Sequence, residues 1–133
     1  MASIHKDIHV GAAPGDAWEA VRDYGAVHER LAPGFVTDTV LDGDDRIVTF
    51  VTGSVARERL IGVDEARRRL VYTVVDGALG AVHHQASVEV VATDGSHGCR
   101  LLWTTDVLPN ELAPVVDALM DQGATAIRRA LAV

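Results

Sequence analysis

Apolar and polar residues alternate along most of the chain before Pro109, which is the pattern of β-strands that bury one face. The strands predicted from this alternation lie at residues 3–10, 35–41, 46–52, 55–63, 70–75, 82–91 and 100–107. Two short stretches, 16–24 and 26–31, and one long stretch, 111–131, have helical periodicity instead. This order predicts an α+β fold in which a run of antiparallel strands buries one face against the last helix.

The long C-terminal helix is predicted from a stripe of apolar and small residues on one side. These residues are Leu112, Val115, Val116, Leu119, Met120, Gly123, Ala126, Ile127 and Ala130. Arg128 and Arg129 suit the negative end of its dipole. Near the N-terminus, Asp16 is predicted to cap the first short helix, because a carboxylate there can accept from free backbone N–H groups.

Turn lengths predict which residues pair across neighbouring strands, and pairing decides which face each side chain takes. Turns at 42–45, 53–55, 64–68 and 94–97 predict the pairs Thr37–Phe50, Phe50–Glu58, Leu60–Tyr72, Glu58–Val74, Val88–Trp103 and Ala86–Thr105. The face predicted to meet the helix then carries Phe35, Thr37, Val48, Phe50, Ala56, Glu58, Leu60, Leu70, Tyr72, Val74, His84, Ala86, Val88, Val90, Leu101, Trp103, Thr105 and Val107. The opposite face is mostly polar and is expected to meet solvent.

Small residues occur on both walls of the predicted core. Ala56 and Ala86 lie on the sheet, and Gly123 and Ala126 lie on the helix that faces it. Because cores are normally filled to crystal-like density, small residues on both walls allow a cavity between them. The alternative is that helix and sheet simply approach each other closely at these positions.

Three polar residues, Glu58, Tyr72 and His84, fall on the otherwise apolar inner face. A buried carboxylate is costly unless it pairs with a cation or hydrogen-bonds to a ligand or water. We predict His84 as the cationic partner of Glu58 and Tyr72 as a neighbour across the strands. A polar cluster in an apolar wall is typical of a small-molecule site. The alternatives are a structural cluster bridged by water, or a Glu58 that reaches solvent at a pocket mouth.

Composition narrows the classes of protein and partner. The chain of 133 residues has 48% hydrophobic residues and a net charge of −7, which disfavours nucleic acid as a partner. One cysteine, Cys99, excludes an internal disulfide and a thiolate metal cluster. The spacing of His5 and His9, and the opposite faces of His83 and His84, disfavour a metal site.

The same residues predict where the protein resides and how it is organised. No N-terminal signal pattern and no apolar run of the roughly 20 residues needed for a membrane helix is found. We therefore predict a cytoplasmic protein without membrane insertion. Residues 1–133 are predicted to form a single domain that is a monomer or a homodimer.

Three stretches of the chain resemble the START-like, helix-grip superfamily (SRPBCC), in its bacterial polyketide cyclase/dehydrase-like branch. They are 13–24, read as the strand exit and first helix; 53–60 with Asp64 and 69–72, read as the central hairpins; and 102–104 before Pro109, read as the closing segment. The resemblance spans nearly the whole chain. Each motif alone is weakly specific, and their order and spacing are more so.

The resemblance implies a curved antiparallel sheet of seven strands around a long C-terminal helix, with two short helices after the first strand. It also implies a cavity for an apolar small molecule, faced by Glu58, Tyr72 and His84. The plant abscisic-acid receptors are relatives, but their gating loop is longer than the segment here before Glu58. Their pocket lysine falls near Thr37, so hormone reception is not implied.

Three functions are compatible with these observations. The first is binding or carriage of a small hydrophobic molecule of polyketide, lipid or isoprenoid type, without a cofactor. Its predicted binding residues are Thr37, Phe50, Glu58, Leu60, Tyr72, His84, Ala86, Trp103, Thr105, Leu119, Gly123 and Ile127. The second is a cyclase, aromatase or dehydratase with Glu58 or His84 as base and Tyr72 as acid. The third is a protein-interaction module with a vestigial cavity.

Overall fold

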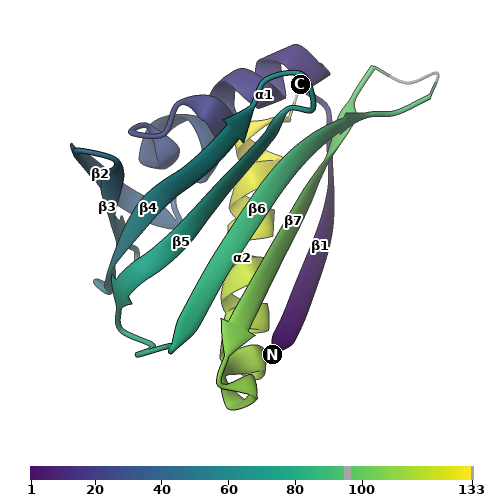
Figure 1. The fold of residues 1–133 in the computed structure, drawn as a ribbon. Helices are drawn as coiled ribbons and strands as arrows, with labels where there is room; N and C mark the ends of the chain where they lie inside the picture. Colours follow the sequence, from purple (N-terminus) through teal and green to yellow (C-terminus); the bar gives the residue numbers. More distant parts are fainter. Residues whose placement is uncertain (95–96, 133) are drawn as a thin grey trace.

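A seven-stranded antiparallel sheet curves around one long helix in the computed structural model, which describes residues 1–94 and 97–132 (Figure 1). The strands are β1 (Ala2–Val10), β2 (Val36–Asp42), β3 (Asp45–Phe50), β4 (Val55–Asp64), β5 (Arg69–Gly77), β6 (His83–Ala92) and β7 (Cys99–Leu108). The helices are α1 (Pro14–Arg22), the π-helix η1 (Val27–Leu31), the 3-10 helix η2 (Asn110–Leu112) and α2 (Ala113–Ala130). The predicted α+β class and element order are confirmed.

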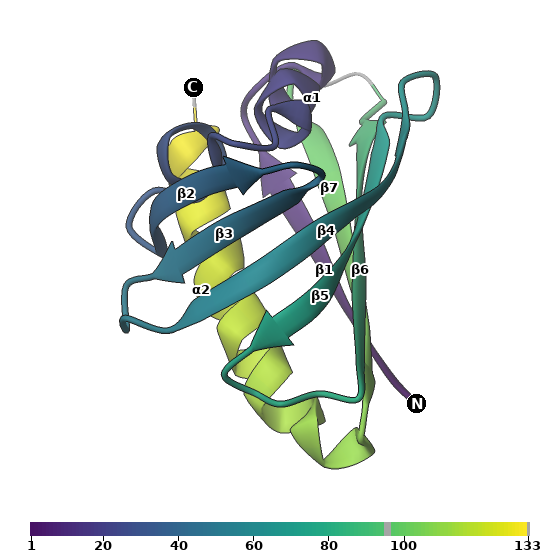
Figure 2. The same cartoon turned by 60° about the vertical axis from the view of Figure 1, so that its left-hand side comes forward.

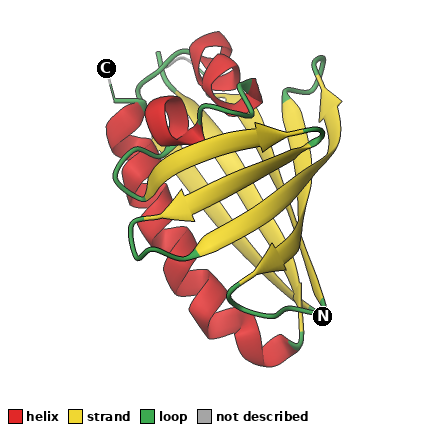
Figure 3. Ribbon diagram, turned by 90° about the vertical axis from the view of Figure 1, so that its left-hand side faces the viewer, coloured by secondary structure: helices red, strands yellow, loops and turns green. Residues whose placement is uncertain are grey.

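The strands follow the order β1-β7-β6-β5-β4-β3-β2, so the first strand pairs with the last one. Helix α2 runs along the concave side of the sheet, and α1 and η1 lie at one end of it (Figures 2 and 3). Lys6 of β1 ties the sheet to α2, because its Nζ lies 2.6 Å from Asp117 Oδ1 and 2.8 Å from Asp121 Oδ1. At the other end of α2, the Ala12 N–H donates to the Leu131 carbonyl over 2.9 Å.

Helix α1 closes the end of the sheet near the β4–β5 turn. Its residues Trp18 and Val21 are buried in the main core cluster. The Trp18 indole Nε1–H donates to Glu65 Oε2 in that turn over 2.8 Å, and Arg22 Nε donates to Glu65 Oε1 over 3.0 Å. Asp16 is not the cap predicted for this helix. The helix begins at Pro14, which has no N–H to be capped.

Four of the predicted strand pairs are observed: Leu60–Tyr72, Glu58–Val74, Val88–Trp103 and Ala86–Thr105. They fix the inner faces of β4, β5, β6 and β7 as predicted. Gly95 and Ser96 of the predicted turn at 94–97 lie outside the described residues.

The predicted pairing of Phe50 with Glu58 is wrong, because the β3–β4 turn closes earlier. The Phe50 N–H donates to the Ser54 carbonyl, and the Gly53 N–H donates back to the Phe50 carbonyl, both over 2.8 Å. Gly53 has a φ of 91°, a conformation that glycine adopts without steric cost. The strands are thereby shifted so that Arg46 lies opposite Glu58.

The predicted inward orientation of Thr37 is also wrong. A β-bulge between Val36 and Asp38 places Val36, not Thr37, opposite Phe50. Val36 is buried, whereas Thr37 is exposed and its hydroxyl donates to the Thr49 carbonyl over 3.2 Å. The alternation of apolar and polar residues did not reveal this bulge in β2.

Candidate functional site

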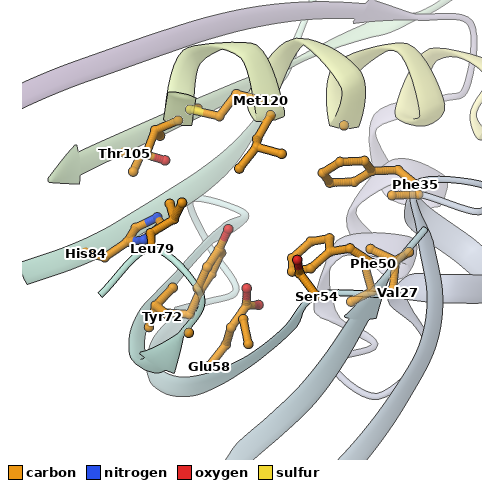
Figure 4. A pocket seen from close by; sticks show the side chains of 18 of the residues that line it. Val27, Phe35, Phe50, Ser54, Glu58, Tyr72, Leu79, His84, Thr105 and Met120 are labelled. Carbon is orange, nitrogen blue, oxygen red and sulfur yellow. The ribbon is translucent and has the colours of Figure 1, made fainter. Parts of the chain in front are cut away.

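A cavity of about 340 Å³ lies between the concave face of the sheet and α2. Its volume falls in the range of about 300–1,000 Å³ found for small-molecule pockets. Most of its wall is apolar, including Val27, Phe35, Phe50, Trp103, Leu119 and Met120. Figure 4 shows the two phenylalanines on one side, His84 and Thr105 on the other, and Glu58 and Tyr72 on the wall between them. The inner face of the sheet and α2 therefore enclose a cavity whose wall is mostly apolar, with a few polar side chains contributed by the sheet.

The opening of this cavity lies where wall residues are exposed to solvent. They are Thr52 and Ser54 of the β3–β4 turn with Val55 at the start of β4, and Asp76 near the end of β5 with Ala78 and Gly80 of the β5–β6 loop. Val55 and Val75, also at this rim, are 48% and 42% exposed. An apolar ligand would therefore enter between these two connections, away from α1.

The charge partner of Glu58 is Arg46, not His84 as predicted. Arg46 Nε donates to Glu58 Oε1 over 2.8 Å, and the two side chains are only 6% and 9% exposed. The pair forms because Arg46 and Glu58 are directly opposite on β3 and β4. Burial alone would lower the pKa of Arg46, but Glu58 and the neighbouring tyrosines raise it overall, so the guanidinium stays charged.

Two tyrosine rings enclose the Arg46 guanidinium. Its Cζ lies 4.0 Å from the centroid of the Tyr24 ring and 4.9 Å from that of Tyr72. Cation–π contacts of a desolvated guanidinium contribute about 2 kcal/mol or more. The Tyr24 hydroxyl also donates to the Glu58 carbonyl over 2.8 Å, which holds this ring in place. Arg46 is therefore fixed by contacts on both faces as well as by its carboxylate partner.

Tyr72 and Trp103 add polar atoms to the same part of the wall. Burial raises the pKa of the Tyr72 phenol, and the charge of Glu58 raises it further, so the hydroxyl keeps its proton. The buried Trp103 indole N–H has no hydrogen-bond partner of good geometry, although it lies close enough to the Tyr72 hydroxyl to lower that pKa slightly.

His84 is a neutral imidazole on the cavity wall. Burial lowers its pKa, and the nearby His83 lowers it further, so the ring is uncharged at neutral pH. Its backbone carbonyl accepts from the Thr73 hydroxyl over 3.1 Å, which fixes the strand on which it lies. A neutral imidazole has one donor and one acceptor nitrogen, so His84 can bind either partner or take up a proton.

The cavity wall contains nine of the twelve residues predicted to bind ligand. These are Phe50, Glu58, Tyr72, His84, Trp103, Thr105, Leu119, Gly123 and Ile127. Thr37, Leu60 and Ala86 are not part of the wall. Thr37 points outward at the bulge, and Leu60 packs in the core beyond Glu58, towards the α1 end. Ala86 is 2% exposed, and its methyl group is enclosed between Tyr72 and Thr105 on the adjacent strands.

Arg46 is a charged wall residue that the sequence analysis did not predict. It has the same parity along β3 as Val48 and Phe50, both predicted to face inward. That parity was the available signal, but Arg46, the first residue of the predicted strand 46–52, was left out of the predicted inner face. Tyr24 was predicted to be the last residue of the helix at 16–24, but it follows the end of α1, and its ring contacts Arg46.

Residues 1–94 and 97–132 lack the features of two other kinds of site. No group of three or more His, Cys, Asp or Glu side chains in these ranges is arranged to hold a metal ion. Within the same ranges, no helix has the length and apolar character needed to cross a bilayer.

The sheet, the long helix and the enclosed cavity define the helix-grip class of small-molecule pocket proteins. A comparison with protein families gives a match over residues 1–132 to the family described as polyketide cyclase / dehydrase and lipid transport. The chain belongs to this family, which confirms the resemblance to START-like, SRPBCC proteins. No match was found among the curated proteins.

Solved structures support the same fold. The protein XoxI from Bacillus cereus superimposes with a TM-score of 0.87 over 98% of this chain and 96% of its own, at 16% identity. A protein from Thermobifida fusca has 30% identity and a TM-score of 0.77 over 98% and 91% of the two chains. Norcoclaurine synthase from Thalictrum flavum, as a point mutant in complex with a transition-state analogue, has 26% identity and a TM-score of 0.71 over 98% and 93%.

Proposed function

We propose that the protein binds or carries a small hydrophobic molecule in the cavity between the sheet and α2. The observation that supports this most directly is the cavity itself, about 340 Å³ with a mainly apolar wall. Its polar atoms are gathered on Glu58, Tyr72, His84 and Thr105, so they can orient the polar end of a ligand. The apolar body would then contact Phe50, Trp103, Leu119 and Ile127, together with Gly123 of α2.

The family description and one relative indicate which molecules to consider. Family membership favours polyketide-like and lipid-like ligands, including isoprenoids. Norcoclaurine synthase has also been solved in complex with dopamine and hydroxybenzaldehyde, which are small hydroxylated aromatic molecules. We infer that this chain takes ligands of similar size, and that it does so in the cytoplasm, where its one cysteine, the buried Cys99, would stay reduced.

Binding of an apolar probe tests the proposal. We expect the neutral naphthalene dye prodan to bind the purified protein with a blue-shifted emission, because the cavity offers an apolar environment of sufficient volume. The melting temperature should rise with dye concentration, since a ligand that binds only the folded state stabilises it. Native mass spectrometry of freshly purified protein would detect a molecule that copurifies and competes with the dye.

Two results would contradict this function. One is that prodan leaves the melting temperature unchanged, which would mean that it does not bind the folded protein more tightly than the unfolded protein. The other is a panel of apolar polyketides, fatty alcohols and isoprenoids in which no member raises the melting temperature. Those results would favour the third hypothesis, an interaction module whose cavity is vestigial.

A catalytic function is the second candidate, and the neutral His84 ring in the wall favours it. Ring closure of a polyketone begins when a base removes a proton from a carbon between two carbonyls. An uncharged imidazole can accept that proton, and the protonated Tyr72 hydroxyl can donate to the carbonyl oxygen that is attacked. Loss of water then gives the cyclic product without a cofactor.

The pH dependence of turnover tests this second candidate. His84 must be neutral to act as the base, and its pKa lies below the ordinary value of 6.5. The cyclisation rate of an uncharged triketone should therefore be constant near pH 7–8 and fall only as pH drops below that lowered pKa. The substitution His84→Asn should abolish turnover at every pH while prodan binding persists. A rate equal to that in buffer, or unaffected by His84→Asn, would exclude His84 catalysis.

A further inference from the structure

Arg46 and Glu58 form a buried ion pair on the cavity wall, so their opposite charges balance each other. Their side chains are 6% and 9% exposed and are joined by a 2.8 Å hydrogen bond. Among the described residues of the wall, Asp76 is the other charged side chain, and it lies exposed at the opening. His84 is held neutral by burial. The interior therefore has no net charge at neutral pH and no unpaired cation or anion.

This balance makes a charged ligand unfavourable inside the cavity. A carboxylate would lose its hydration and find a guanidinium whose charge Glu58 already neutralises. The two faces of that guanidinium are also covered by Tyr24 and Tyr72, so a ligand cannot stack on it. An ammonium ion would meet Glu58 only next to the positive charge of Arg46. Protonation of His84 could neutralise an incoming carboxylate, but burial opposes that protonation.

The polar atoms that remain free in the wall suit an uncharged ligand. Oε1 of Glu58 accepts the hydrogen bond from Arg46, and the Glu58 carboxyl group faces the cavity (Figure 4). Its other oxygen accepts no hydrogen bond from the described residues, so it can accept from a ligand hydroxyl. The neutral His84 ring on the same wall has one donor and one acceptor nitrogen, which suit a hydroxyl or carbonyl group.

We propose that the Arg46–Glu58 pair acts as a charge filter: the cavity admits uncharged molecules that carry a hydroxyl or carbonyl group and rejects alkyl carboxylates and alkylammonium ions. This inference rests on the proposed binding function and specifies its ligand class. Fatty alcohols, ketones and uncharged polyketides belong to the accepted class. Free fatty acids in their ionised form do not, although they have the same apolar body.

Three probes of equal chain length and different charge test the filter in the wild-type protein. At pH 7, 1-decanol should displace bound prodan at a concentration at least tenfold lower than decanoate or decylammonium, all held below their micelle-forming concentrations. Displacement by decanoate within threefold of that by decanol would overturn the filter while leaving the binding function intact. No prodan binding at all would overturn both, so the two failures can be told apart.

The substitution Glu58→Gln provides the second arm, because it keeps the size of the side chain and removes the charge that neutralises Arg46. Decanoate should then bind at least tenfold more tightly than to the wild type, with its carboxylate facing the freed guanidinium. Asp38→Asn, at an exposed position on β2, makes the same change in net charge and should leave all three affinities unchanged.

A gain for decanoate in Glu58→Gln alone supports the filter. An equal gain in Asp38→Asn, or no gain in a folded Glu58→Gln protein, overturns it. If Glu58→Gln does not fold, the comparison of the three probes on the wild-type protein decides the question by itself.

Discussion

Replacement of Arg46 by methionine should lower the free energy of unfolding by about 3–5 kcal/mol, the cost typical of removing one partner from a buried ion pair. The carboxylate of Glu58 would remain buried without its cation. Methionine has a similar length and a polarisable sulfur that can contact the Tyr24 and Tyr72 rings, so the loss reports mainly on charge. Urea-induced unfolding followed by tryptophan fluorescence would measure it.

A double substitution separates the charge effect from packing. Arg46→Met combined with Glu58→Leu replaces both charges with apolar groups of similar volume, a change that is often neutral for buried pairs. We expect the double variant to recover at least half of the stability lost in Arg46→Met. Arg67→Met is a matched control, since the Arg67 side chain is 70% exposed and should matter by less than about 1 kcal/mol. If the double variant loses as much stability as Arg46→Met and Glu58→Leu lose in sum, the two residues are not coupled.

Leucine in place of Gly123 should reduce affinity for prodan at least tenfold while changing stability little. A Cβ atom at this position would lie 2.9 Å from two atoms of the Trp103 ring and 3.3 Å from Phe35, so a larger side chain must push these rings or enter the cavity. The rings border open space and can move into it, which keeps the strain small. Leucine also favours the helix over glycine by about 0.5–1 kcal/mol.

The matched control for this substitution is Ala118→Leu, on the exposed side of α2. It adds a leucine to the same helix without touching the cavity, so dye affinity should stay within twofold of wild type. Fluorescence titration gives the affinities, and urea unfolding confirms that both variants fold. Unchanged prodan binding by a folded Gly123→Leu protein would place the dye elsewhere on the molecule.

The fold was predictable because its elements depend on local alternation and on turn residues. The hairpin of β6 and β7 illustrates this: both strands alternate cleanly, and the predicted pair Val88–Trp103 is observed. In β4 and β5 the predicted pair Leu60–Tyr72 is observed although a bulge follows Leu60. Register survives there because a one-residue slip would turn Leu60 and Tyr72 towards solvent.

The site was less predictable because it depends on the β3–β4 turn, whose position the residue types did not reveal. Residues 50–52 are apolar or β-branched and continue the β pattern, yet the strand ends at Phe50. The turn at residues 51–53 comes two residues earlier than predicted, which moves Arg46 opposite Glu58 and changes the chemistry of the wall. The alternation of residues along β4 correctly placed Glu58 on the inner face. Its partner Arg46 depended on the register between β3 and β4, which no local pattern determines.

The pairing of β1 with β7 has a consequence for how the chain acquires its structure. Ile4 pairs with Thr105, and β7 therefore gains its second neighbour from the opposite end of the sequence. During synthesis, β1 must wait until β7 has left the ribosome before the two strands can pair. Contacts of such large sequence separation slow folding, because the loop between them must be ordered first. The closing of the sheet around α2 is thus expected to be a late step in folding.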